Sequence, residues 1–161
     1  LRFAPGGAGL KIATLRIANN DSDENPYDVG ISGMGVAAPE INVKRGTTSI
    51  PDDIGTYDFG QMIVDVPKDV EFTIENLGTA DLNLTGSPRV QVAGGSSRFY
   101  VVSGPASPVA PGATTTFRLR FVPNTSATFS ATVTIMFQAS VQHWSVPMSV
   151  MKVGECISRW N

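Results

Sequence analysis

The chain has 161 residues, enough for one ordinary domain and a fragment of a second. Its 12 basic and 14 acidic residues leave a net charge of −2, which provides no basic field and argues against nucleic acid as a partner. One cysteine excludes an internal disulfide framework, and one cysteine with one histidine excludes a Cys/His zinc site. No stretch approaches the roughly 18 apolar residues that span a bilayer, so no membrane span is expected.

The first residues of the chain return near its end. Two pairs of segments match in order and spacing: LRFAPGGAGLKIATLRI (1–17) with LRFVPNTSATFSATVTI (119–135), and YDVGIS (27–32) with WSVPMS (144–149). This alignment places Tyr27 on Trp144. Self-similarity of this kind indicates tandem copies of one domain. Since the sequence alternates like a strand from Leu1 onward, we expect the chain to be a piece of something longer.

The repeat sets the predicted domain boundaries. Residues 1–36 are interpreted as the C-terminal part of a preceding immunoglobulin-like repeat, 37–153 as a complete domain, and 154–161 as a tail. A piece of two strands cannot bury its own apolar side chains. We therefore expect four of these side chains to pack on the complete domain, to pack on another chain, or to stay poorly ordered: Leu15, Ile17, Val29 and Ile31.

Strand signals are frequent within residues 37–153. Three segments alternate apolar and polar residues with the period of a half-buried strand: 69–76, 116–121 and 131–137. Shorter candidates are 41–44, 57–66, 82–86, 89–94, 98–102 and 143–150. Clusters of Gly, Pro, Asn and Ser separate them, and no window has a convincing helical period. The pattern predicts an all-β protein with an immunoglobulin-like antiparallel β-sandwich.

Four phrases extend over most of the chain: IANNDSDENPYDVGISGMGVAAPEINV (17–43), YDFGQMIV (57–64), FTIENLGTADLNLTGSPRVQV (72–92) and FYVVSGPASPVAPGATTTFRLRFVP (99–123). In this order they resemble the choice-of-anchor D type of bacterial immunoglobulin-like repeat, which is related to ASH (hydin-like) and major-sperm-protein-like sandwiches. The resemblance implies a spacer or interaction module of a secreted or surface-anchored protein, without a shared catalytic site. The chain departs from this pattern at 137–147, where FQASVQHWSVP replaces the NNDSDENPY loop.

The acidic loop NNDSDENPY (19–27) offers a weak candidate calcium site. Asp21, Asp23 and Asn25 have the alternate spacing of the first ligands of a calcium-binding loop. Such a loop also requires a glycine at its sixth position and a glutamate at its twelfth, where this chain has Pro26 and Ser32. A hairpin turn is the favoured interpretation, because Asn, Asp and Ser side chains bond their own backbone in turns.

No constellation of catalytic residues stands out. The only histidine, His143, lies in a predicted strand beside Trp144, and no serine sits in a nucleophile elbow. A carboxylate pair of the glycosidase type stays open, with candidates in turns or on polar strand faces: Asp52, Asp53, Asp65, Glu71 and Glu75. Cys156 lies in the tail, where no neighbour in the sequence is expected to activate its thiol.

Exposed aromatic rings are the remaining candidates for binding. Tyr100 and Trp144, with Phe99 and Trp160, could stack on a sugar ring, although the place of Trp144 in the repeat favours a core or interdomain role. We therefore predict a non-enzymatic spacer or interaction module, extracellular or in the cell envelope. Neighbouring repeats of the same chain are its expected partners, together with a protein or glycan ligand. The alternative is a carbohydrate- or peptide-binding module that uses an aromatic cluster or a sheet edge.

Overall fold

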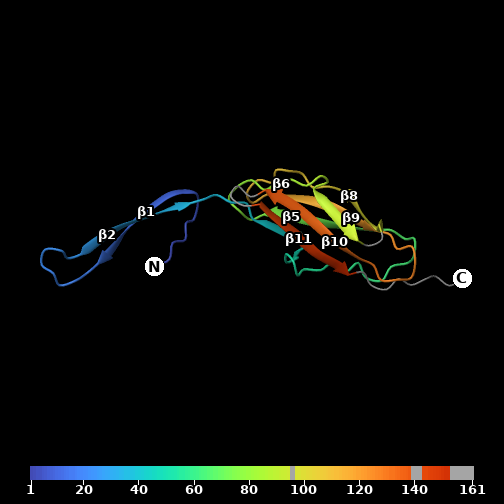
Figure 1. Cartoon of the computed structure of the whole chain (residues 1–161), viewed down its shortest axis with the longest axis horizontal. Helices are drawn as coiled ribbons and strands as arrows, with labels where there is room; N and C mark the ends of the chain where they lie inside the picture. The colour runs from blue at the N-terminus through green and yellow to red at the C-terminus, as the bar shows by residue number, and fades with distance from the viewer. Residues whose placement is uncertain (95–96, 139–142, 153–161) are drawn as a thin grey trace. The chain divides into compact units, whose positions relative to one another are not determined.

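The computed structural model describes residues 1–94, 97–138 and 143–152, and it describes the backbone alone at Gln138 and through 143–152. The chain divides into two compact units, Leu1–Ala37 and Ala38–Asn161. Figure 1 labels the strands of both units.

The first unit is a two-stranded ribbon preceded by an extended segment. Strands β1 (Gly9–Ile17) and β2 (Tyr27–Gly35) pair antiparallel, from Gly9 opposite Gly35 to Ile17 opposite Tyr27. Because side chains alternate along a strand, this register places the odd-numbered residues of both strands on one face and the even-numbered residues on the other. The odd face is predominantly apolar, as expected for a ribbon that covers a core.

The second unit contains a five-stranded antiparallel sheet in the order β4-β3-β5-β9-β8. Its strands are β3 (Ile41–Arg45), β4 (Thr48–Ser49), β5 (Lys68–Asn76), β8 (Phe99–Ser103) and β9 (Thr114–Phe121). Strands β5 and β9 pair along their whole length, from Lys68 opposite Phe121 to Glu75 opposite Thr114. Apolar and polar residues alternate with a period of two in both strands, which explains why one face of the sheet is apolar and the other is polar.

The other sheet of the second unit is built around β10. Its strands are β6 (Asn83–Leu84), β7 (Val90–Gly94), β10 (Ser130–Gln138) and β11 (His143–Lys152). Strand β11 lies along one side of β10, and β6 and β7 both pair with β10 along its other side. A β-bulge interrupts the β10–β11 register between Ala131 and Val133.

Inward-facing side chains of the two sheets form one core, which makes the second unit a β-sandwich. Phenylalanine dominates it: the rings of Phe72 and Phe117 stack at 5.2 Å, and those of Phe99 and Phe121 stack at 4.5 Å. The β10 side contributes Val133 and Ile135 together with smaller residues. The predicted all-β, immunoglobulin-like antiparallel sandwich is thus confirmed.

Residues 57–66 differ from the prediction, because they do not form a strand. Gly60 has a φ of 75° and Asp65 a φ of 62°, both in the left-handed region that interrupts an extended backbone. A turn closes from the Val66 amide to the Ile63 carbonyl oxygen at 3.2 Å. Phe59 and Met62 of the segment are nevertheless buried in the core, whereas Val66 is exposed. The sequence pattern therefore indicated burial and was wrong about the backbone.

The two hairpins that the repeat aligns have different registers. Ile17 pairs with Tyr27 in β1–β2, whereas its counterpart Ile135 pairs with Val146 and not with Trp144. The shift along β11 is two residues at Ile135 and Val133, and the β-bulge between Val133 and Ala131 ends this correspondence. Trp144 instead lies opposite Phe137, two residues beyond Ile135 along β10.

Candidate functional site

The acidic loop 18–26 joins β1 to β2 and is closed by its own side chains. Asn19 Nδ2 donates a hydrogen bond to the Glu24 carbonyl oxygen at 2.8 Å, and Asn19 Oδ1 accepts one from the Asp21 amide at 2.7 Å. Asn25 Oδ1 accepts a hydrogen bond from the Asn19 amide at 3.2 Å. These are the bonds by which Asn and Asp side chains build turns. The loop therefore needs no ion to close the hairpin.

The three candidate calcium ligands all lie in this exposed loop. The Asp23 amide lies 3.5 Å from Asp21 Oδ1, and a hydrogen bond with the Asp23 side chain lowers the pKa of Asp21. The Asn25 oxygen is already engaged by Asn19. Within the part of the chain that the structure describes, no group of three or more His, Cys, Asp or Glu is arranged to hold a metal ion. Calcium binding by Asp21, Asp23 and Asn25 stays a prediction.

Ion pairs run across the outer face of the five-stranded sheet. Arg120 on β9 donates to both carboxylate oxygens of Asp69 on β5, at 2.6 and 2.9 Å, and Arg118 donates to Glu71 at 3.2 Å. The hydrogen bond from Arg120 holds the pKa of Asp69 below its ordinary value. Opposite charges directly across a sheet support the strand pairing. Glu71, a candidate catalytic carboxylate, is thus paired on an exposed face.

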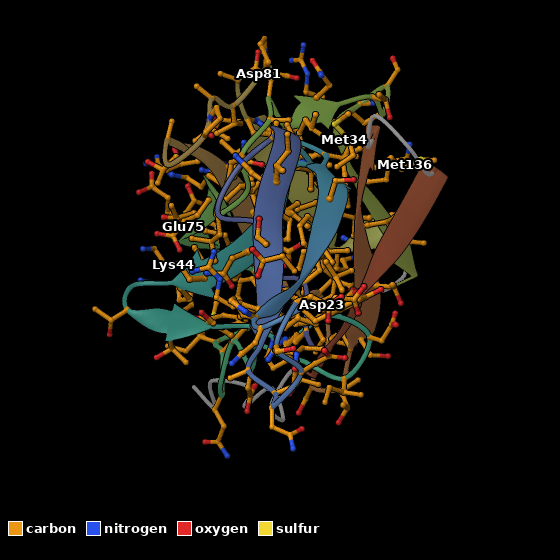
Figure 2. The ribbon with its side chains drawn as sticks, turned by 90° about the vertical axis from the view of Figure 1, so that its left-hand side faces the viewer. Asp23, Met34, Lys44, Glu75, Asp81 and Met136 are labelled. Atoms are coloured by element: carbon orange, nitrogen blue, oxygen red, sulfur yellow. The ribbon has the colours of Figure 1, made fainter. Side chains whose placement is uncertain are left out.

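Lys44 on β3 and Glu75 on β5 extend this pattern (Figure 2). Glu75 accepts hydrogen bonds from Lys44 Nζ and, at 2.8 Å, from Asn42 Nδ2. The bond from Lys44, followed by that from Asn42, lowers the pKa of Glu75. A carboxylate held ionised in this way is a poor general acid at neutral pH.

Asp52 has a different environment from the other candidate carboxylates. It lines a pocket of ≈ 230 Å³ together with Glu40 and several apolar side chains: Ile41, Val43, Ile50, Pro51 and Ile135. Burial, followed by the charge of Asp53, raises the pKa of Asp52. Glu71 and Glu75 lie on the outer face of the sheet instead. The structure therefore does not gather the candidate carboxylates into one site.

The candidate binding aromatics come from different sheets. Tyr100 lies in β8, the last strand of the five-stranded sheet, and its side chain is 44% exposed. Trp144 lies in β11 of the other sheet; its side chain, like that of His143, lies outside the described part of the structure. Cys156 and Trp160 also lie outside the described residues. Phe99 is buried against Phe121, so its proposed place in an aromatic platform is wrong.

Asn76 was not singled out from the sequence, and it is the most highly connected polar residue of the core. It is fully buried. Its Nδ2 donates to the carbonyl oxygens of Ala80 at 2.7 Å and Val109 at 2.9 Å, and its Oδ1 accepts from the amides of Glu40 at 3.2 Å and Gly78 at 3.0 Å. Every hydrogen-bonding position of the amide is therefore used, as burial requires.

Asn76 belongs to a clamp that holds the first residues of the second unit. The Ala38 carbonyl oxygen accepts from the Thr79 amide at 2.8 Å, and the Glu40 carbonyl oxygen accepts from the Leu77 amide at 2.7 Å. Gly78 packs so closely that an added Cβ would overlap the Ala38 carbonyl oxygen and the Glu40 amide nitrogen. Segment 38–40 is thus fixed to loop 76–80. The signal in the sequence was the asparagine that ends an alternating strand and precedes Leu-Gly.

The odd face of the β1–β2 ribbon is open. Leu15 is 38% and Ile17 47% exposed, and Tyr27 opposite Ile17 is 51% exposed. The extended N-terminal segment lies against the part of the ribbon away from the loop: Leu1 and Phe3 line a pocket with Ala13 and Ile31, and the Phe3 ring would lie 2.7 Å from a Cβ added to Gly33. These exposures are consistent with the prediction that two strands cannot bury their own apolar face.

In the described part of the chain, no helix is long and apolar enough to cross a membrane. By its fold the second unit is an immunoglobulin-like β-sandwich, which defines a structural class and no activity. The chain belongs to the family described as "Protein of unknown function (DUF1573)", whose family model matches residues 53–151. No curated protein matches the sequence significantly.

Several solved structures are similar to this chain. A protein of unknown function from Porphyromonas gingivalis W83 has a TM-score of 0.48 at 14% identity, over 95% of this chain and 67% of that one. The ASH/PapD-like domain 7 of human CEP192 has a TM-score of 0.47 at 10% identity, over 74% of this chain and 87% of that one. The VesB protease of Vibrio cholerae has a TM-score of 0.47 at 14% identity, over 63% of this chain and only 29% of its own.

Proposed function

We propose that this chain is a non-catalytic structural module of a multi-repeat protein, in which each sandwich spaces its neighbours. The observation that carries the proposal is the clamp on segment 38–40. A spacer sets the position of what it carries only if the polypeptide is held where it joins each domain, and Asn76 and Gly78 hold it there through hydrogen bonds and close packing. The carboxylates paired on the sheet surface are consistent with a structural role.

The finer parts of the proposal rest on the sequence. The motif order supports a repeat of the choice-of-anchor D type, and with it a place outside the cell or in the cell envelope. Residues 1–36 are proposed to be the end of a preceding repeat. Labelling intact cells of the native host with a membrane-impermeant reagent tests the location, because an intracellular module would stay unlabelled until lysis.

Limited proteolysis of the full chain tests the clamp. We expect a broad-specificity protease to spare 38–40 until the sandwich unfolds, since backbone that is hydrogen bonded and packed resists cleavage. Gly78→Ala forces a Cβ against Ala38 and Glu40, and it should expose 38–40 to cleavage in native buffer. Gly104→Ala is the matched control, because a Cβ there meets nothing within 4 Å. Equal cleavage of wild type and Gly78→Ala would remove the basis of the proposal.

A second candidate function, binding of a peptide or glycan, is favoured by the edge of β8. This strand pairs with β9 on one side and ends its sheet, and Tyr100 and Val102 are 44% and 45% exposed. An extended peptide can add to such an edge, and a ring such as Tyr100 can stack on a sugar. Peptide and glycan arrays test both. Binding that Tyr100→Ala abolishes and Met136→Ala preserves would establish this function, and arrays without a hit would reject it.

A further inference from the structure

The half of the β1–β2 ribbon nearest the loop is amphipathic across its two faces, whereas the even face of the other half carries exposed Leu10, Ile12 and Met34. The apolar odd face carries Ala13, Leu15 and Ile17, opposite Ile31, Val29 and Tyr27 respectively. The even face is polar near the loop, where Arg16 donates to both oxygens of Asp28 at 3.0 Å. A ribbon that is polar on one face and apolar on the other is suited to cover a core with the apolar face. Within the first unit, β1 and β2 pair only with each other, and Leu15, Ile17 and Tyr27 are exposed on the odd face.

The chain itself contains the covered form of this face. The repeat aligns Leu15 with Val133 and Ile17 with Ile135, which lie on the inward face of β10. Val133 and Ile135 are each 1% exposed, against 38% for Leu15 and 47% for Ile17. What covers β10 is the inner face of the five-stranded sheet, rich in phenylalanine. Leu15 and Ile17 are two residues apart in β1, as Val133 and Ile135 are in β10, so each pair shares one face of its strand.

The first three residues extend the correspondence to a second strand. Leu119 and Phe121 end β9 and are fully buried, whereas their counterparts Leu1 and Phe3 are 101% and 54% exposed. Leu1–Phe3 thus has the sequence of the end of a β9-like strand without the sheet to which such a strand belongs. In the first unit Phe3 rests on Gly33 instead.

We propose that the occupant of the odd face of β1–β2 is the inner face of a five-stranded sheet like β4-β3-β5-β9-β8, supplied by the segment that precedes Leu1 in a longer protein. This segment would resemble residues 38–118 and would end in a β9-like strand that continues into Leu1–Phe3. The inference rests on the proposed repeat architecture and names the partner of its open half-domain. Leu15, Ile17 and Val29 would then be core residues of a preceding sandwich.

A fusion protein tests the proposal on the full chain. Residues 38–118 of this chain are joined directly to Leu1, so that Thr116-Phe117-Arg118 continues into Leu1-Arg2-Phe3 as in β9. Hydrogen exchange is then compared between the fusion protein and the chain alone. We expect the amides of β1 and β2 to exchange on the order of 100-fold more slowly in the fusion protein, because a packed sandwich opens far less often than a bare ribbon.

Two variants of the fusion protein give the test its specificity. Ile17→Glu places a charge on the odd face and should abolish the added protection, whereas Thr14→Glu changes the even face and should preserve it. Protection of β10 reports that the second unit is folded in each case. Unchanged exchange of β1–β2 in the fusion protein would overturn the proposal. So would concentration-dependent protection of the chain alone, because it would identify a second copy as the occupant.

These outcomes are independent of the spacer function. Proteolysis at 38–40 depends on the clamp within the second unit, while exchange in β1–β2 depends on what covers the first. If proteolysis showed no clamp at 38–40, the inference about the partner of β1–β2 would be unaffected. If the fusion protein gained no protection, the clamp would be unaffected.

Discussion

Asn76 Oδ1 accepts a hydrogen bond from the Glu40 amide at 3.2 Å, which joins two residues 36 positions apart in the sequence. The same side chain satisfies two carbonyl oxygens on the opposite side of its amide. One buried asparagine therefore fastens the first residues of the sandwich to two of its loops. A chain held at this point keeps its course into the sandwich even where no regular secondary structure defines it.

Asn76→Ala is expected to lower the free energy of unfolding by roughly 2–4 kcal/mol, because it leaves several buried backbone groups without partners. Urea denaturation measures the change. Asn83→Ala, an exposed residue of β6, is the control and should stay within about 0.5 kcal/mol of wild type. Equal stability of the two variants would mean that water replaces the lost amide.

Phe121→Ala should cost about 3–5 kcal/mol, the range for removing a large buried ring. Phe121 is fully buried, stacks on Phe99 at 4.5 Å and lies 5.6 Å from Phe129. Tyr100→Ala, next to Phe99 in β8 but on the outer face, should melt close to wild type. Thermal unfolding followed by circular dichroism checks both, and a larger loss from Tyr100→Ala would contradict the assignment of faces in β8.

Stability should decrease as the pH falls below the ordinary carboxyl range. The hydrogen bonds from Arg120 and Lys44 lower the folded-state pKa of Asp69 from 3.8 and that of Glu75 from 4.5. In this pH range the unfolded chain binds more protons than the folded one. The two ion pairs therefore contribute to the free energy of unfolding above the ordinary pKa values, and this contribution is lost as the pH falls through the lowered pKa values. Asp69 is exposed and Glu75 only half-buried at the sheet surface, so solvent screens both ion pairs and the effect is small.

The midpoint of urea denaturation, measured from about pH 6 to about pH 2, gives the slope of stability against pH. The double variant Asp69→Asn with Glu75→Gln removes both titrating groups and should flatten it. A slope that the double variant leaves unchanged would assign the pH dependence to other carboxylates.

Calcium should change the melting temperature by no more than about 1 °C, because side chains of the acidic loop are already hydrogen bonded to the loop backbone. An ion that does not bind the folded state does not stabilise it. Differential scanning fluorimetry with millimolar calcium tests this, with magnesium for comparison. A shift of several degrees that Asp21→Asn with Asp23→Asn abolishes would identify a cation site after all.

The local pattern of apolar and polar residues was sufficient to predict much of the fold. The alternation in 69–76, 116–121 and 131–137 predicted the long central strands β5, β9 and β10, because a half-buried strand imposes a period of two on its own sequence. The same alternation assigned Phe72 and Ile135 to the core. The internal repeat likewise identified 1–17 and 27–32 as the counterparts of a later hairpin, since matching residues recur at matching spacing.

Tertiary structure decided what depends on partners far away in the sequence. Phe99 and Tyr100 are adjacent aromatics, and only the pairing of β8 with β9 places the first in the core and the second outside. Residues 57–66 look like a strand, yet left-handed residues turn them into an irregular segment that still buries Phe59. The sequence around Asn76 does not show that its side chain bonds the backbone of Glu40, Ala80 and Val109, because only the folded chain brings these residues together. A sequence determines which side chains avoid water along one strand, whereas hydrogen bonds to distant backbone exist only once the sheets have packed.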